Sequence, residues 1–166
     1  MIDNYKPKTV VGTTYHKLGD QRNTANAWGD WDPEEFTVED SAFGFIVMEN
    51  GTTIILESSW ALNSLDVGEA QTTLCGTKAG ADMKDGLRIN GVDLNKMYIK
   101  KPSLGAGGVD FYEGQSEDPE YKEAKAWIDA VINDTDPVVM PEQALAVTEI
   151  LEAIYESAKT GKPVTF

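Results

Sequence analysis

The chain has 166 residues, of which 41% are hydrophobic and 25% charged, which is the composition of a globular domain and not of a disordered segment. Its 28 acidic and 14 basic residues give a net charge of −14, which repels phosphate backbones and argues against nucleic acid as a partner. The single cysteine, Cys75, excludes an internal disulfide and a cysteine-based zinc site, and no stretch approaches the roughly 20 apolar residues of a membrane helix.

The first two-thirds of the chain predicts β-strands. The dipeptide Asn50-Gly51 between two apolar runs is the strongest short-range signal of a hairpin. Because the apolar runs follow one another with short turns between them, the strands should pair mainly in antiparallel fashion. The expected strands cover residues 9–18, 41–49, 52–61, 68–76, 79–84, 87–90 and 92–100.

Two helices are predicted in the last third of the chain. Asp118, Pro119 and Glu120 form a helix start, with Asp as the N-cap and Pro in the first helical position. Pro141 opens the second helix, and Gly161 ends it before an extended tail. The expected apolar stripes are Tyr121, Ala124, Trp127, Ile128, Val131 and Ile132 in the first helix, and Ala144, Leu145, Val147, Thr148, Leu151, Ile154, Tyr155 and Ala158 in the second.

These elements predict an α+β fold, with one large, mainly antiparallel open sheet of seven strands and two C-terminal helices on one of its faces. The strand at residues 41–49 is apolar on both sides: Phe43 and Phe45 point one way, Ile46 and Met48 the other. A sheet with one wet face normally alternates apolar and polar residues. Since two helices cover one face only, we expect a second domain or a symmetric copy to cover the other face. A symmetric copy would make the protein a dimer or a higher oligomer, which is what we expect.

Four stretches of the chain carry a family resemblance: VVGTTYHKLG, EDSAFGFIVMENGTTIILESSWALN, AKAWIDAVIND and PEQALAVTEILEAIYESAKTGKPVTF. In this order they resemble the C-terminal domain of the glucose-fructose oxidoreductase/inositol dehydrogenase/rhizopine-catabolism (Gfo/Idh/MocA) family. The resemblance implies an NAD(P)-dependent oxidoreductase that acts on a sugar, a polyol or a related metabolite. It also implies an N-terminal Rossmann domain followed by an α+β domain, and residues 1–166 resemble the second domain alone.

The family's cofactor and catalytic motifs have no counterpart in these residues. Its dinucleotide glycine fingerprint, its Glu-Lys-Pro lysine and its Asp-x-x-x-His pair are all missing. The resemblance therefore implies a substrate-side and oligomerisation domain that is inactive by itself, with no catalytic, cofactor-binding or metal-binding residue of its own. NAD or NADP would bind to the Rossmann domain. The opening residues MIDNYKPKTV have no apolar core of the signal-peptide type, so we expect a cytoplasmic protein.

Candidate substrate-binding residues lie in a long polar loop and at the end of a predicted strand. They are Arg22, Asn23, Trp28, Trp31, Trp60 and Asn63. Sugar pockets commonly combine an aromatic face with amide or guanidinium hydrogen-bonding groups, and the resemblance implies that the end of the strand at residues 52–61 helps to line the substrate pocket. The alternative is that these tryptophans are core or interface residues, where aromatic side chains dominate in general.

The remaining motifs are interpreted as structural. His16 has Gly12 instead of Asp four residues before it, so it does not match the family's catalytic histidine, and it is interpreted as a strand side chain. The glycine-rich stretch 105–108 is not followed by a helix start, which favours a loop over a phosphate cradle. The acidic DWDPEE turn lacks the glycine that a calcium loop carries at its sixth position. Cys75 is expected to be a small buried residue.

A second class of function stays open at this point, namely a non-catalytic assembly or small-molecule-binding module that uses the exposed sheet face. The reading frame upstream of Met1 separates the two classes. A Rossmann fingerprint followed by Asp-x-x-x-His in that frame indicates the oxidoreductase, whereas a frame without them favours the module.

Overall fold

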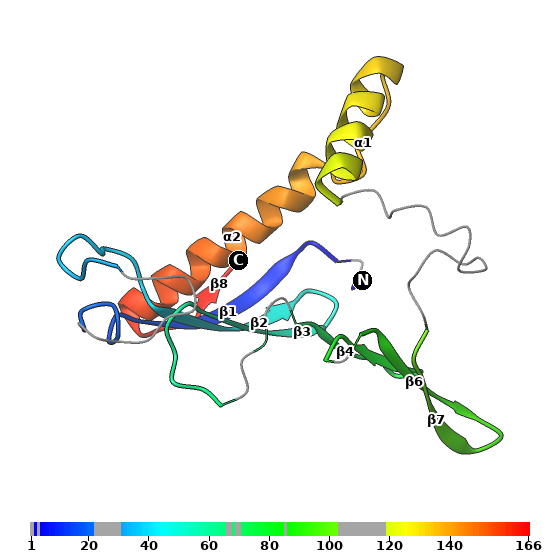
Figure 1. The fold of residues 1–166 in the computed structure, drawn as a ribbon, viewed down its shortest axis with the longest axis horizontal. Coiled ribbons are helices and arrows are strands. Elements are labelled where there is room, and N and C mark those ends of the chain that lie inside the picture. The colour runs from blue at the N-terminus through cyan, green and yellow to red at the C-terminus, as the bar shows by residue number, and fades with distance from the viewer. Residues whose placement is uncertain are drawn as a thin grey trace. The chain divides into compact units, whose positions relative to one another are not determined.

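A computed structural model of the chain describes residues 2, 4–21, 31–65, 68, 71–84, 86–102 and 119–166. They belong to two compact units, Met1–Asn63 with Ala130–Phe166, and Ser64–Asp129. Each unit contains a four-stranded antiparallel sheet, and two helices are described with them (Figure 1). The α+β class and the antiparallel pairing predicted from the sequence are confirmed. The strands form two sheets, however, and not a single sheet of seven.

The first sheet has the strand order β3-β2-β1-β8. Its strands are β1 (Pro7–Tyr15), β2 (Ser41–Met48), β3 (Thr53–Ser59) and β8 (Val164–Thr165). The β2–β3 hairpin turns at Asn50-Gly51, as predicted. Gly51 has a φ of 83°, which suits glycine, and the Asn50 side chain accepts a hydrogen bond from the Thr52 N–H at 3.0 Å. β8 brings the tail of the chain beside β1, where Val164 pairs with Val10.

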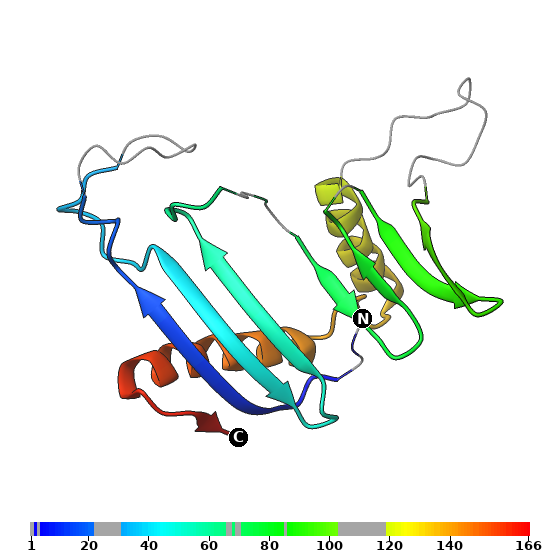
Figure 2. The same cartoon turned by 90° about the horizontal axis from the view of Figure 1, so that it is seen from below.

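Helix α2 (Pro141–Thr160) packs across one face of this sheet, as Figure 2 shows. Gly12 and Gly44, which pair across β1 and β2, let the helix approach closely. A Cβ on Gly12 would lie 2.6 Å from the Ile154 carbonyl oxygen, and a Cβ on Gly44 would lie 2.6 Å from Ile154 Cδ1. The Gly12 N–H donates a hydrogen bond to Ser157 Oγ at 3.0 Å, so strand and helix are joined directly. The buried core between them comprises Val10, Ile46, Met48, Ala153 and Ile154.

The buried face of α2 differs from the predicted stripe. Its buried residues are Ala146, Ala153, Ile154 and Ser157. Ile154 of the predicted stripe is buried as expected, but four of its other large side chains are exposed, namely Leu145, Val147, Leu151 and Tyr155. The physical reason is the close approach of the helix to the glycine pair, which leaves space for the Ile154 side chain and otherwise for small residues.

The ends of the helices follow the sequence signals. Helix α1 (Pro119–Asn133) and α2 both begin at a proline. Gly161 ends α2 with a left-handed φ of 67°, and its N–H donates to the Ser157 carbonyl at 2.8 Å. The large apolar side chains of the α1 stripe are exposed, so the surface against which α1 packs stays a prediction. Neither of these two described helices is long and apolar enough to cross a membrane.

The second sheet has the strand order β4-β5-β6-β7. Its strands are β4 (Thr73–Cys75), β5 (Gly80–Asp82), β6 (Arg88–Asp93) and β7 (Lys96–Lys100). The predicted break between strands at Gly91 is wrong, because the hairpin turns at Leu94 and Asn95, with φ values of 47° and 61°. Gly91 lies within β6 and makes room for Tyr98, whose hydroxyl oxygen would be 2.4 Å from an added Cβ. Cys75, expected to be buried, is exposed because β4 is a short strand at the sheet edge.

The observed buried face of α2 leads to a prediction. Replacing Ile154 by Ala should lower the free energy of unfolding by about 2–5 kcal/mol, because it empties a filled slot in the core. Leu151→Ala, on the exposed side of the same helix, should cost less than about 1 kcal/mol. Urea denaturation followed by circular dichroism measures both variants. Equal losses would show that the buried face is assigned wrongly.

Candidate functional site

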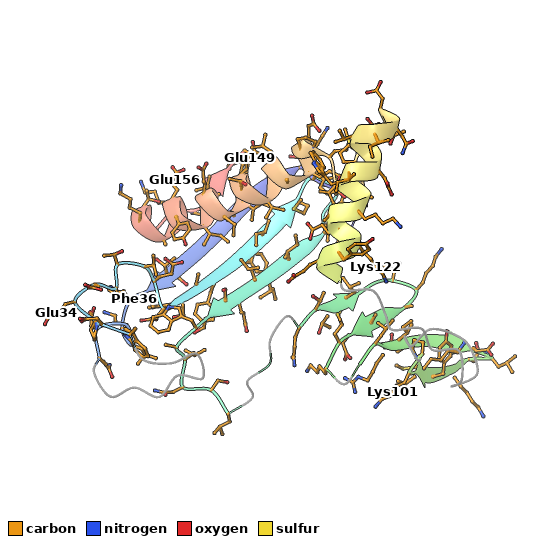
Figure 3. All side chains as sticks on the ribbon, turned by 45° about the horizontal axis from the view of Figure 1, so that its top comes forward. Glu34, Phe36, Lys101, Lys122, Glu149 and Glu156 are labelled. Atoms are coloured by element: carbon orange, nitrogen blue, oxygen red, sulfur yellow. The ribbon has the colours of Figure 1, made fainter. Side chains whose placement is uncertain are left out.

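An aromatic cluster lies at the end of the first sheet where β1 and β3 stop. Its rings belong to Trp31, Phe36 and Trp60, which are half-buried, and to the exposed His16. Trp31 and Trp60 meet edge to face, with ring centroids 4.8 Å apart and planes at 89°. The Phe36 centroid lies 4.4 Å from that of Trp60 and 6.2 Å from that of His16. Figure 3 shows Phe36 beside these strand ends. Edge-to-face contact is a favoured geometry for aromatic pairs, so the rings stabilise one another.

Each tryptophan of the cluster is fixed at its polar end by the backbone. Trp31 Nε1 donates a hydrogen bond to the Gly19 carbonyl at 2.8 Å. Trp60 Nε1 donates to the Glu39 carbonyl at 2.8 Å, and the Trp60 backbone N–H donates to the Asp40 carbonyl at 3.1 Å. Because buried indole N–H groups need a partner, these bonds set both the position and the tilt of the rings.

The carboxylate of Asp40 organises the turn that follows β1. One oxygen accepts hydrogen bonds from the backbone N–H groups of Lys17, of Leu18 at 2.7 Å and of Gly19 at 3.3 Å. The other oxygen accepts the Ser41 hydroxyl at 2.9 Å. Asp40 is only 2% exposed. Successive amides that point at one anion form a nest that favours negative charge, and this nest holds the turn in place.

The hydrogen bonds decide the ionisation of Asp40. Burial by itself raises the pKa of the carboxyl group, but the bonds from Leu18, Lys17, Ser41 and Gly19 outweigh burial and lower the pKa below its ordinary value of 3.8. Asp40 is therefore an anion at neutral pH. Asp40 has no recognisable signal in the sequence, because its hydrogen-bond partners precede it by 21 to 23 positions and locally it is only an acidic residue before an apolar strand.

The neighbouring residue, Glu39, connects the cluster to α2. The Tyr155 hydroxyl donates a hydrogen bond to Glu39 Oε1. This bond is the main cause that raises the pKa of Tyr155 above 10.0, because it disfavours the phenolate next to a carboxylate. Since the Glu39 carbonyl also holds the Trp60 indole, one dipeptide, Glu39-Asp40, bonds to the turn after β1, to the end of β3 and to α2.

His16 lies beyond the end of β1, and its assignment to a strand is wrong. The strand stops at Tyr15 because the amides that follow turn toward Asp40 and leave the ladder. His16 Nε2 is 3.3 Å from Asp20 Oδ1, and both side chains are exposed. An exposed pair of this kind contributes little to stability. His16 is exposed and touches Phe36, so it lies on the solvent side of the cluster.

The predicted substrate-binding residues divide into two sets. Trp31 and Trp60 are brought into contact, and Asn63 is exposed just beyond Trp60. Phe36 and Asp40 belong to the same site, although the sequence analysis gave neither a role. The other three predicted residues, Arg22, Asn23 and Trp28, lie outside the described part of the chain. The glycine-rich stretch 105–108 lies outside it as well.

Metal-ligating side chains do not cluster among the described residues. No group of three or more His, Cys, Asp or Glu side chains comes together among them. In the acidic DWDPEE turn, Asp32 Oδ1 accepts the Glu34 N–H at 2.9 Å, which is a turn contact. Both α1 and α2 begin at a proline, which has no backbone N–H to offer a phosphate at the first position of the helix.

The lowered pKa of Asp40 predicts how stability depends on pH. A group with a lowered folded-state pKa stabilises the fold fully above its unfolded value, here 3.8, and the contribution is lost as the pH falls through the folded-state value. Asp40→Asn should therefore lower the unfolding free energy at pH 7 by about 1–3 kcal/mol, with a smaller deficit in acid. Urea midpoints measured from pH 7 to pH 2 test this. A deficit that is the same at every pH would contradict it.

Several known proteins are similar to this chain. D-glucoside 3-dehydrogenase of Escherichia coli (strain K12) is 27% identical over 157 residues, which cover 95% of this chain and 42% of that protein. The chain thus spans less than half the length of this curated relative.

Two solved structures share its fold. Levoglucosan dehydrogenase in complex with NADH and L-sorbose superposes with a TM-score of 0.68 at 14% identity, over 96% of this chain and 44% of that chain. Aldose-aldose oxidoreductase from Caulobacter crescentus, complexed with glycerol, gives a TM-score of 0.63 at 16% identity, over 97% of this chain and 42% of that chain.

The family match covers nearly the whole chain. The model of the oxidoreductase family's C-terminal alpha/beta domain, GFO_IDH_MocA_C, matches residues 6–166. The chain belongs to the Gfo/Idh/MocA oxidoreductase family, as its C-terminal domain.

Proposed function

We propose that this domain supplies the substrate side of an NAD(P)-dependent oxidoreductase that acts on a sugar, a polyol or a related metabolite. The observation that carries the proposal is the fixed Trp31–Trp60 pair at the end of the first sheet. Half-buried aromatic faces beside polar groups suit the apolar faces and hydroxyl groups of a carbohydrate. The relative from Escherichia coli is named a D-glucoside 3-dehydrogenase, which supports this substrate class.

The roles of the residues follow from their positions. Trp31 and Trp60 would present ring surface to the substrate, and Asn63 would offer an exposed amide just beyond Trp60. Arg22, Asn23 and Trp28, which precede Trp31 in the sequence, are proposed to complete this side of the pocket. NAD or NADP would supply or accept the hydride when bound to the N-terminal Rossmann domain, and this domain alone would be inactive.

The substrate proposal predicts a kinetic pattern. In the whole enzyme, Trp31→Ala should raise KM for the sugar or polyol on the order of tenfold, with kcat changed much less, because it removes binding shared by ground and transition states. Initial rates of nicotinamide reduction, measured over a panel of sugars and polyols, test this. A matched control is Trp127→Ala, an exposed tryptophan of α1 outside the aromatic cluster. An unchanged KM in Trp31→Ala would remove the ring from the pocket.

The inactivity of the isolated domain is testable by cofactor binding. The 166-residue chain has a net charge of −14 and no glycine fingerprint, so it should not bind the anionic dinucleotide. Titration of NADH followed by its fluorescence should give no saturable signal. Saturable binding at micromolar concentration would overturn the assignment of the cofactor to the other domain.

The open face of the first sheet is the proposed oligomer contact. Val11, Phe45 and Ile55 are adjacent across β1, β2 and β3 and are all exposed, with Ile55 at 71%. They line a shallow hollow that also includes Phe43. Exposed apolar side chains that adjoin one another in this way mark an interaction surface. A two-fold contact between copies is the commonest way in which oligomers cover such a surface.

A charge placed on this face should dissociate the oligomer. Ile55→Asp would force a carboxylate against the apolar side chains of the partner copy, whereas Leu145→Asp lies on α2, which covers the opposite face of the sheet. Sedimentation equilibrium at tens of micromolar should give a dimer or a higher oligomer for the unmodified protein and for Leu145→Asp, and a monomer for Ile55→Asp. A monomeric unmodified protein, or an Ile55→Asp variant that still associates, would refute the contact.

A further inference from the structure

The Asp40 carboxylate controls more than the turn to which it bonds directly. Its bond to the Gly19 N–H holds the same residue whose carbonyl accepts the Trp31 indole N–H at 2.8 Å. Gly19 thus transmits the position of a buried anion to an aromatic ring. The Gly19 N–H is bonded to Asp40 and the Gly19 carbonyl is bonded to the Trp31 indole, so a shift of the carboxylate should displace the ring.

The second ring of the pair depends on the same strand segment. Trp60 bonds to the carbonyls of Glu39 and Asp40, at 2.8 Å from the indole and 3.1 Å from the backbone N–H. The Ser59 hydroxyl also donates to the Asp40 carbonyl at 3.0 Å. Both tryptophans are therefore linked to Asp40 by hydrogen bonds: Trp31 through Gly19 and the Asp40 side chain, and Trp60 through the Asp40 backbone carbonyl. Their rings meet edge to face.

There is little space in which the turn could relax. A Cβ on Gly19 would lie 2.8 Å from the His16 ring and 3.2 Å from the Phe36 ring, so the backbone of the turn is enclosed by the cluster. Asp40 itself is almost completely buried. Loss of its charge cannot be compensated by water without opening the cluster, because its three amide donors would lose their shared anionic acceptor.

We infer that Asp40 is a positioning residue for substrate binding, which sets the geometry of the Trp31–Trp60 pair through the Gly19 carbonyl. The inference rests on the proposed function, since the pair is the proposed sugar-binding surface. Asp40 itself contacts neither substrate nor cofactor in this account. It fixes the register of the turn, and the turn fixes the ring that the substrate meets.

The test is a double-mutant cycle in the whole enzyme. Asp40→Asn should raise KM for the sugar or polyol about five- to tenfold in the unmodified background and by less than about twofold in the Trp31→Ala background, because there the ring through which Asp40 acts is gone. Equal increases in both backgrounds would overturn the inference. Asp82→Asn is the matched control: this carboxylate pairs with Arg88 at 2.6 Å in the second sheet and should leave KM unchanged.

A spectroscopic arm separates this inference from the proposed function. Near-ultraviolet circular dichroism of the substrate-free enzyme reports tryptophan packing, and Asp40→Asn should reduce the tryptophan signal whereas Asp82→Asn should not. If the unmodified enzyme oxidises no sugar or polyol, the proposed function fails. If it is active but Asp40→Asn leaves KM and the tryptophan signal unchanged, the positioning role fails.

A second variant keeps the test decisive if Asp40→Asn does not fold. Trp31→Phe keeps a smaller aromatic ring and removes the indole N–H that donates to the Gly19 carbonyl. It should raise KM about two- to fivefold with little change in kcat, because the ring loses its anchor. An unchanged KM in Trp31→Phe would show that the link through Gly19 does not position the ring, and would overturn the inference.

Discussion

The site depends on one interaction, the capture of three consecutive backbone amides by the buried carboxylate of Asp40. These amides follow Tyr15, the last residue of β1, and donate to the carboxylate instead of to a neighbouring strand. The Gly19 carbonyl on the same turn then receives the Trp31 indole. Because a buried charge is tolerated only when its hydrogen bonds are complete, the turn has one well-defined conformation.

Close packing also shapes the face of the first sheet that α2 covers. Gly12 and Gly44 form a slot that admits Ile154 and brings the α2 backbone against the strands, where Ser157 accepts the Gly12 N–H. The large residues of α2 are therefore turned outward, and Tyr155 among them reaches Glu39 beside the aromatic cluster. The helix that covers the core thus also supports the end of the sheet where the proposed pocket lies.

Local signals in the sequence predicted most helix ends and turns. The hydrogen bonds of Asp40 and the contact between the tryptophans join residues far apart in the chain, and the sequence could not predict them. The Asn50-Gly51 turn, the proline helix starts and Gly161 act within a few residues, so the sequence predicted them correctly. The turn at Leu94 and Asn95 carries no glycine and gave no such signal. Asp40 bonds to residues more than twenty positions earlier, so no local pattern could assign it a role. Trp31 and Trp60 were selected by residue type, but their contact depends on that distant carboxylate.

Native-state hydrogen exchange tests the central claim most directly. If Asp40 holds the turn, the amides of Lys17, Leu18 and Gly19 should exchange as slowly as those of the paired strand β1, although they lie outside any ladder. Asp40→Asn should accelerate the exchange of these three amides, while the Gly12 amide, which is bonded to Ser157, should stay protected. Exchange of the three amides at the rate of the exposed Asn50-Gly51 turn in the unmodified protein would contradict it.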